Sequence, residues 1–264
     1  RRRRRFPELS PRPKGKPQRA ESTKYGLSDF SLADMTRCGA ELRKMGAGAS
    51  SMEQVANKIV RFLYDHIVDE ETGERRISLV RLFKTHPYED LDSDLKRFAV
   101  DALGQEPEVP STKCLTLLAT AGEKEEWNSR LLSKHHKTIP LPSEEMVHAF
   151  PMISNLVSQF GLEVTEFLDP SPSMMLDIDQ RTYNVFHVGD AVGSEFIVDQ
   201  ESFVIPMGIA STVGFGGMLP SGNLFAVIMF CKVPVDAVVA SMFRTISLSA
   251  KLALLPFEDQ VFDK

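Results

Sequence analysis

The sequence predicts an α+β fold built on a central antiparallel sheet of about five or six strands, with N- and C-terminal helices packed on one face. Two observations carry this prediction. Residues 203–232 contain two long apolar strands, 208–219 and 224–231, joined by a turn at 220–223. A long segment, 235–255, then places apolar residues at helical spacing.

The second of these strands begins LFAVIMF and has no polar residue in seven positions. A strand this apolar is typical of one that is buried on both faces, so we expect it near the centre of the sheet. The turn before it has suitable residues, because Pro220 presets φ and both Gly222 and Asn223 tolerate a positive φ.

Two helices are predicted before the first strand. The first has a single apolar face and ends at Gly46; that face consists of Leu32, Met35, Cys38, Leu42 and Met45. The second is expected to begin at Ser50, because Glu53 three residues later completes a capping box. Its apolar stripe runs from Met52 to Ile67.

Strands and helices alternate in the middle of the chain. The predicted strands are 76–85, 113–122, 181–188 and 195–199. Ser93 is expected to cap a short helix that ends at Leu103. A helical pattern from Met146 to Phe160 contains Pro151, which predicts a kink or two consecutive helices with Pro151 at the first position of the second.

The last helix is expected to turn one apolar face inward and its polar residues elsewhere. The inward residues are Val235, Val238, Val239, Met242, Ile246, Ala250 and Ala253, and the others are Arg244, Ser247 and Lys251.

Charge is divided unevenly along the 264 residues. Residues 1–24 contain ten Lys and Arg and two Glu, a net charge of +8. The whole chain carries −5, so residues 25–264 carry a net charge of −13. This basic, Pro-rich tail has no apolar periodicity, and we expect it to be disordered. It is either an unstructured linker or a contact for an anionic surface or nucleic acid. The acidic body gives no support for a nucleic-acid-binding domain.

Several patterns bear on location. No apolar run approaches the ~18–20 residues of a membrane span, and the arginine run at the N-terminus has no apolar segment of a secretory signal behind it. The chain does not begin with Met, so we expect a processed or excised piece. Three widely spaced cysteines, Cys38, Cys114 and Cys231, argue against a disulfide scaffold and predict a reducing, cytoplasmic location.

Few residues indicate a particular chemistry. HExxH, CxxC and GxSxG motifs are absent from the sequence, so neither a metal site nor a hydrolase is indicated. The glycines at 214, 216 and 217 lie in a strand, which favours a bulge or a close approach to the backbone over a phosphate loop. His187, in a predicted strand, is either a ligand contact or a half-buried structural histidine. His135, His136 and His148 are interpreted as solvated.

The order of elements resembles that of GAF-type sensor domains, which are relatives of PAS domains. The segments SLVRLF, CLTLLATAG, FVIPMGIASTVGFGGML and LFAVIMF and the helix at 235–255 occupy the places of the GAF strands and closing helix. The segments RTYNVFHV, LPSEE and GIASTVGFGGMLPSGNLFAVIMFCKVPV are similar to a sensory region that precedes the kinase core in some bacterial hybrid sensor histidine kinases.

This resemblance implies a cytosolic sensory input domain that signals through its terminal helices as a homodimer. The implied organisation is a basic tail (1–24), an N-terminal helix (25–48), a GAF-like sensor domain (49–257) and a C-terminal tail or linker (258–264). It also implies a small-molecule pocket between the sheet and its loops. The expected pocket residues are His187, Asn184, Phe186, Phe203, Phe215, Met207 and Ser211.

The sequence departs from two GAF subfamilies and leaves two other functions open. No cysteine lies between Cys114 and Cys231 for attachment of a bilin, and the NKFDE-type pattern of cyclic-nucleotide GAF domains is missing. No cofactor is indicated, and a kinase reaction would belong to an output domain outside this chain. The alternatives are a scaffold or protein-interaction domain without a ligand and a GAF-like thiol redox enzyme, which would need a low-pKa, accessible cysteine.

Overall fold

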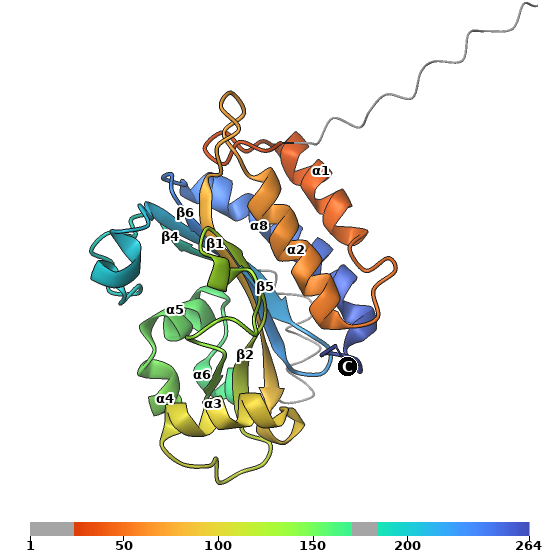
Figure 1. The fold of residues 1–264 in the computed structure, drawn as a ribbon, viewed down its shortest axis with the longest axis vertical. Coiled ribbons are helices and arrows are strands. Elements are labelled where there is room, and N and C mark those ends of the chain that lie inside the picture. Colours follow the sequence, from red (N-terminus) through yellow and green to blue (C-terminus); the bar gives the residue numbers. More distant parts are fainter. Residues whose placement is uncertain (1–23, 171–183, 264) are drawn as a thin grey trace, which may run out of the picture.

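A computed structural model describes residues 24–170 and 184–263 of the chain (Figure 1). Within these residues, one antiparallel sheet of six strands has the order β3-β2-β1-β6-β5-β4. The strands are β1 (Ile77–Pro87), β2 (Lys113–Gly122), β3 (Thr138–Pro140), β4 (Asn184–Val188), β5 (Ser211–Met218) and β6 (Leu224–Cys231). The predicted fold class is confirmed, whereas β3 was not anticipated.

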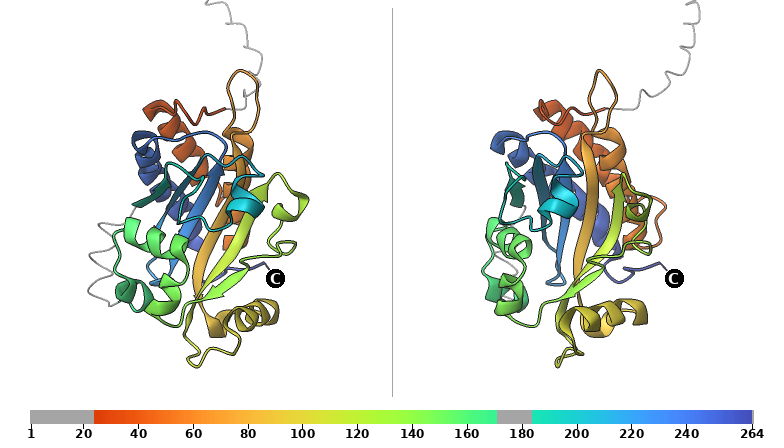
Figure 2. Two further views of the ribbon diagram at one scale, coloured as in Figure 1. Left: turned by 90° about the vertical axis from the view of Figure 1, so that its left-hand side faces the viewer. Right: turned by 60° about the vertical axis from the view of Figure 1, so that its left-hand side comes forward.

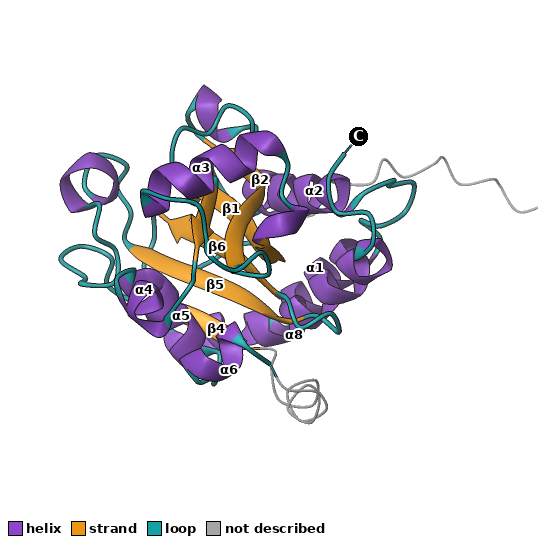
Figure 3. Cartoon of the chain, turned by 90° about the horizontal axis from the view of Figure 1, so that it is seen from below, coloured by secondary structure: helices purple, strands orange, loops and turns teal. Residues whose placement is uncertain are grey.

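Helices cover both faces of the sheet, in different ways (Figures 1 and 3). The helix face is covered by α1 (Leu32–Arg43), α2 (Met52–His66) and α8 (Ala237–Leu254), as predicted for the terminal helices. The opposite face carries the short helices α4 (Glu144–His148), α5 (Pro151–Gln159) and α6 (Val164–Leu168).

Two loops complete the cover of this second face, which we call the loop-covered face. They are residues 125–137, which begin with a 3-10 turn at Glu125–Trp127, and residues 195–209, which contain a π-helical turn at Gln200–Val204 (cyan in Figure 2). The remaining helix, α3 (Ser93–Leu103), packs beside β3. Further 3-10 turns lie at Tyr88–Asp90 and Leu255–Phe257.

Strand β6 lies between β1 and β5, and all eight of its residues are buried, as its apolar sequence predicts. Its alternate side chains enter two separate hydrophobic clusters. Phe225, Val227 and Met229 pack against the helices, and Ile228 and Phe230 pack on the loop-covered face. Both faces of the sheet therefore contribute to the core, which is why the strand contains no polar residue.

Two predicted helix starts are displaced by one residue. Ser51, rather than Ser50, caps α2 by accepting a hydrogen bond from the backbone N–H of Gln54 at 3.1 Å. Asp92, rather than Ser93, caps α3. In α2 the physical reason is that Glu53, the expected partner in a capping box, turns away to pair with Arg130.

Pro151 divides the helical pattern around it into two consecutive helices. Helix α4 ends at His148, and α5 begins with Pro151 at its first position, where the missing N–H leaves no hydrogen bond unmade. This confirms the second of the two outcomes predicted from the sequence.

The strand predicted at 195–199 is wrong: the segment is a turn, and the Gln200 side chain bonds to the backbone of residues between 191 and 197. The Gln200 amide donates to the carbonyl oxygens of Ala191 (3.0 Å) and Ile197 (2.7 Å), and its Oε1 accepts from the N–H of Gly193 at 2.8 Å. Side-chain hydrogen bonds of this kind favour turns over sheet ladders. The segment therefore forms a turn that leads into the π-helical turn.

The inward face of α8 is rotated slightly from the predicted one. Val238 is 68% exposed, although the sequence placed it inward. Ser247 was placed elsewhere but is buried, and its hydroxyl donates to the carbonyl of Gly216 at 2.8 Å. Lys251 is also buried. The rotation follows from Phe243 and Ile246, which together fill the space above the sheet.

One helical stretch among the described residues, Ala237–Phe257, passes a length-and-composition test for a membrane span, with a mean hydropathy of 1.5. The stretch is not an unbroken apolar run, because it contains Arg244 and Lys251. Because 56% of the tested window is buried against the rest of the fold, and because core helices pass the same test, this result is weak support for a membrane span.

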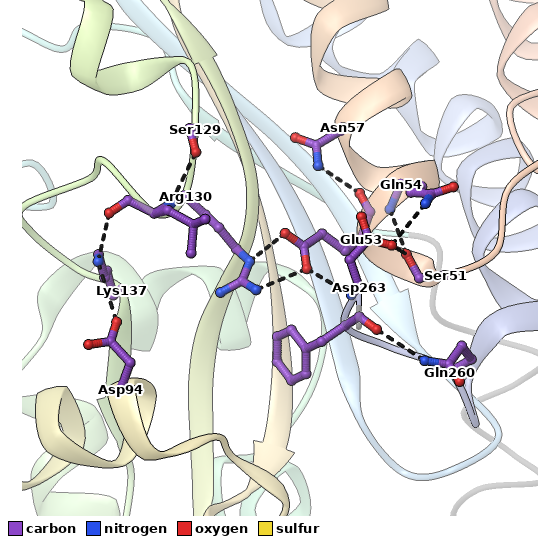
Figure 4. Close-up of polar contacts among 12 residues, drawn as sticks. Ser51, Glu53, Gln54, Asn57, Asp94, Ser129, Arg130, Lys137, Gln260 and Asp263 are labelled. Carbon is purple, nitrogen blue, oxygen red and sulfur yellow. Dashed lines mark hydrogen bonds and ion pairs between the residues drawn. The ribbon is translucent and has the colours of Figure 1, made fainter.

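The last described residues pack against the start of α2 (Figure 4). The carbonyls of Gln260 and Val261 accept from the first two N–H groups of the helix, at 2.8 Å each. Asp263 accepts from the Ser51 hydroxyl at 2.7 Å, and its own N–H donates to Glu53 at 3.1 Å. The predicted domain boundaries stay predictions, although α1 and residues 258–263 both pack on the body of the fold.

A buried lysine lies near this C-terminal segment. Lys84 is 3% exposed, and its ammonium contacts the carbonyl of Thr85 and the ring of His86. Burial lowers the pKa of Lys84 to about 8. Because the folded-state pKa lies below the unfolded one, the penalty for burying the charge is full below pH 8 and decreases as pH rises towards 10.5.

We therefore expect Lys84→Met to stabilise the protein at pH 7 by up to about 3 kcal/mol. The advantage over the wild type should shrink between pH 8 and pH 10.5, because the unfolded wild type retains a proton there that the folded state has lost. Urea unfolding at several pH values measures both effects. Lys44→Met, at an exposed site, serves as the control, and a destabilised K84M protein would refute the prediction.

Candidate functional site

The loop-covered face contains an aromatic cluster that joins both loops to the sheet. Phe203 lies edge-on to Trp127, with ring centroids 5.7 Å apart, and edge-on to Phe230 of β6, at 4.9 Å. Met207 is partly buried against the same cluster. Each loop thus supplies one ring, and the sheet supplies the third.

Arg81 is a charged residue on this otherwise apolar face. It is directly opposite Thr120 of β2 on one side and Ile228 of β6 on the other. Its guanidinium Nη2 donates to the Ser133 hydroxyl at a long 3.4 Å, and its Nε is buried without a hydrogen-bond partner. Among the described residues, no carboxylate forms an ion pair with Arg81. Burial lowers its pKa to about 10, so the group remains charged at neutral pH.

Two buried hydroxyls on the same face also lack partners. The Oγ1 atoms of Thr120 and Thr212 are buried and unbonded. Thr212 in β5 lies opposite Phe230, which places it beside the aromatic cluster. Of the six buried side-chain polar atoms that lack a partner in the described part of the chain, three belong to Arg81, Thr120 and Thr212. Such atoms are rare in folded proteins and require an explanation.

His136 lies in the loop above Arg81 and has an uncommon backbone conformation. Its φ is +58°, in the left-handed region that non-glycine residues seldom adopt. Although the residue lies at the surface, desolvation of its ring lowers its pKa, and the positive charge of Arg81 lowers it further. Asp199, from the other loop, acts in the opposite direction. The electrostatic influence of Arg81 therefore reaches the covering loops.

The predicted pocket residues divide between the two faces. Phe186, Phe203 and Met207 belong to the cluster on the loop-covered face. Phe215 is buried on the helix face, where it stacks on Phe243 with ring centroids 5.8 Å apart. Ser211 is also buried, and its hydroxyl donates to the carbonyl of Val233 at 2.7 Å. These seven residues therefore do not surround one space, and their role in binding stays a prediction.

His187 and Asn184 lie in the edge strand β4 and have structural partners. The His187 ring Nε2 is 2.8 Å from the carbonyl oxygen of Val235, and the His187 backbone exchanges two hydrogen bonds with the amide of Gln159. The Asn184 amide donates to the carbonyl of Phe160. These contacts support the structural interpretation of His187, although it also borders an open hollow of about 610 Å³ that continues to Phe196.

The glycines of β5 allow close packing on both sides of the sheet. A Cβ at Gly216 would lie 3.0 Å from the ring of Phe160, and the carbonyl of Gly216 accepts the hydrogen bond from Ser247 on α8. A Cβ at Gly214 would lie 2.7 Å from Ile228. These contacts confirm the prediction that Gly214 and Gly216 allow close approach to the backbone of the strand.

All three cysteines are reduced and buried. Burial raises the pKa of each thiol to about 12. A redox-active cysteine needs an accessible thiolate, so this environment argues against the thiol redox alternative. Within the described residues, no group of three His, Cys, Asp or Glu side chains is arranged to hold a metal ion.

We expect the native protein to resist thiol labelling. With 5,5′-dithiobis(2-nitrobenzoic acid) at pH 8, native protein should react at none of its three cysteines within minutes, and protein in guanidinium chloride should react at all three. The thiol count from absorbance at 412 nm reads this out. Rapid reaction of one native thiol would contradict the structure and restore the redox hypothesis.

No family model and no curated protein matches this chain. Solved structures give distant similarities. One is the N-acylhomoserine lactone-dependent LuxR family transcription factor CepR2 from Burkholderia cenocepacia, with a TM-score of 0.37 and 10% identity over 85% of this chain and 95% of that chain. Another is the phycoerythrobilin-bound GAF domain of a cyanobacterial phytochrome, with a TM-score of 0.36 and 10% identity over 84% and 95%.

At these TM-scores, neither similarity carries an argument about function. The sheet of six antiparallel strands with helices on either side confirms the predicted α+β class, and the likeness to GAF domains stays a prediction from the sequence. Nothing in the comparisons bears on a histidine kinase.

Interpretation of the sequence missed Arg81, although a signal was present. In the run ISLVRLF, the alternation of a strand places residues 79, 81 and 83 on one face. Leu79 and Phe83 are apolar, so Arg81 is a charge at a core-facing position. The conformation of the two covering loops has no comparable signal, because it depends on packing against the sheet.

Proposed function

We propose that this chain is a sensory domain that binds a small molecule on the loop-covered face of its sheet. One observation carries the proposal: Arg81, Thr120 and Thr212 all present buried, unpartnered polar atoms to this face. A folded protein rarely leaves such groups unsatisfied unless water, an ion or a ligand completes them. A bound molecule would supply the missing hydrogen bonds.

A path for the signal is supported by contacts between the covering loop and the C-terminal end. Ser133, which contacts Arg81, belongs to the same loop as Arg130. Arg130 forms two hydrogen bonds to Glu53, of 2.6 and 3.0 Å, and Glu53 accepts from the N–H of Asp263 (Figure 4). A ligand that moves the loop would shift the position of the C-terminal segment, provided that it binds the two arrangements with different affinity.

The proposal includes a cytosolic homodimer that forms through α1 and α8 and is linked to a histidine kinase. The exposed side of the helix layer is rich in apolar residues: Leu32 is 66% exposed, Val238 68%, Leu248 38% and Leu252 47%. Exposed apolar side chains on these two helices support contact with a partner. The reduced cysteines support a cytoplasmic setting. The kinase link rests on the sequence resemblance alone, and the basic tail lies outside the described residues except for Lys24.

Native mass spectrometry of protein purified from its own host, beside the denatured mass, tests this function. We expect a non-covalent adduct on a dimer, and loss of the dimer in Leu252→Glu. Ser241→Glu, at an exposed polar position of α8, is the matched control and should remain dimeric. A bare monomer would reject the proposal in favour of a scaffold without a ligand.

A further inference from the structure

We propose that Arg81 is the anchor for the carboxylate of an organic acid whose apolar body lies against the aromatic cluster of Trp127, Phe203 and Phe230. This inference rests on the proposed function, because it names the class of ligand that the loop-covered face would take. It requires a free cationic group, a reason to prefer a single negative charge, and an apolar surface within reach of the cation.

The free cationic group is the guanidinium of Arg81. A guanidinium has five N–H donors in a plane, and a carboxylate can accept two of them at once. The one hydrogen bond of Arg81 within the described residues, to Ser133, is long. A charge that is buried in a protein is normally paired with an opposite charge or bound to a ligand. Arg81 is half-buried, and its Nε is shielded from solvent without a hydrogen-bond partner, so a bound carboxylate would complete its hydrogen bonds.

The surroundings favour an anion of single charge. Asp199 and Arg81 both act on the pKa of His136, in opposite directions, and no carboxylate of the described residues forms an ion pair with Arg81 itself. A phosphate dianion would exceed the charge of one guanidinium. A carboxylate matches the charge of Arg81 one for one. The hydroxyl of Thr120, directly opposite Arg81 and unpartnered, could donate a further hydrogen bond to it.

The apolar surface is one step along the sheet. Phe230 of β6 pairs with Leu79, and Ile228 pairs with Arg81, so Phe230 is the diagonal neighbour of Arg81 on the same face. Diagonal neighbours are about 7–8 Å apart, which is close to the length of a small aromatic acid. Phe203 and Trp127 continue this surface into the loops. The site thus combines a charged end and an aromatic end.

Loop residues 195–209 cover the site. They include the π-helical turn at Gln200–Val204 and its flanking residues, of which Val198 is 70% exposed and Ile205 is 59% exposed. Displacing Phe203, which packs by its edges, would give a ligand access to both ends of the site.

Benzoate and its neutral analogue benzamide test the inference, because they share shape and differ in charge. In isothermal titration calorimetry, we expect the wild type to bind benzoate at least tenfold more tightly than benzamide. Arg81→Gln should lose that preference. Arg244→Gln, which removes one exposed positive charge from α8, is the matched control and should keep it. Inorganic phosphate should bind less tightly than benzoate.

The stability of the ligand-free protein provides a second readout. An arginine that binds a ligand destabilises the fold when the ligand is absent, because its charge is then unpaired. Arg81→Met should therefore raise the melting temperature of the ligand-free protein by about 2–4 °C. A purely structural arginine would lower it. Equal binding of benzoate and benzamide, or an unchanged preference in R81Q, overturns the inference whatever the melting temperature. Such a result leaves the sensory function standing if native mass spectrometry shows an adduct, and the absence of an adduct rejects that function separately.

Discussion

Gly216→Ala is expected to destabilise the protein by about 3 kcal/mol or more, or to prevent folding. A Cβ at this position would lie 2.1 Å from the carbonyl oxygen of Phe225 and 2.9 Å from the Cα of Ala226. Both are backbone atoms of β6, so no side chain can rotate to make room. Because β6 is a central strand and β5 pairs with both β6 and β4, the strands would have to separate. Urea unfolding measures the loss.

Gly189→Ala is the matched control for this substitution. Its added Cβ would meet the ring of His187 at an ordinary 3.4 Å, and its φ is not in the left-handed region. We expect a change below about 1 kcal/mol. If G216A unfolds at the same urea concentration as the wild type, then β5 and β6 do not approach each other as the structure shows.

Glu53→Gln is expected to destabilise the protein by about 3 kcal/mol. The substitution keeps the shape of the side chain but removes the negative charge that Arg130 faces. The two side chains are only 10% and 12% exposed, so Arg130 would be left as a charge in a poorly solvated place. The N–H of Asp263 would also face a weaker acceptor. Thermal unfolding should show the loss as a lower melting temperature.

Glu41→Gln breaks a surface pair and serves as the control. Glu41 and Lys44 are 43% and 67% exposed, so their interaction is screened by water, and we expect a change below about 0.5 kcal/mol. Equal effects of E53Q and E41Q would show that Arg130 does not depend on Glu53. In that case the proposed path from the covering loop to the C-terminal segment would be lost.

The strands and helices that the sequence predicted well are those with one dominant signal. The run LFAVIMFC predicted β6 with its observed ends, because full burial leaves no polar residue to confuse the pattern. Pro151 marked the start of α5, because its ring is tolerated there and not in a helix interior.

The failures arose where a side chain or a distant element decides the local structure. The segment 195–199 has the composition of a strand, but the Gln200 side chain binds the carbonyls of Ser194 and Ile197 and the segment forms a turn. The short strand β3 exists because Ile139 can pair with Leu115 at the sheet edge, which three residues of sequence do not reveal.

The candidate site was predicted only in part. Phe186, Phe203 and Met207 share one face because they pack on the same cluster, and Phe215 and Ser211 lie on the other face because a strand turns alternate residues to opposite sides. The sequence alone was enough to identify Arg81 as a charge at a core-facing position of its strand. That Arg81 has no acidic partner could not be predicted from the sequence, since this depends on which residues the fold brings together.

A small molecule bound on the loop-covered face should slow hydrogen–deuterium exchange in the loops that cover it. Protein purified from its own host would be compared with the same protein unfolded in guanidinium chloride and refolded in ligand-free buffer. If a small molecule is bound on this face, residues 125–137 and 195–209 of the protein as purified should exchange more slowly, with little difference on the exposed side of α8. Equal exchange rates of both loops in the two samples would contradict the binding of a small molecule on this face.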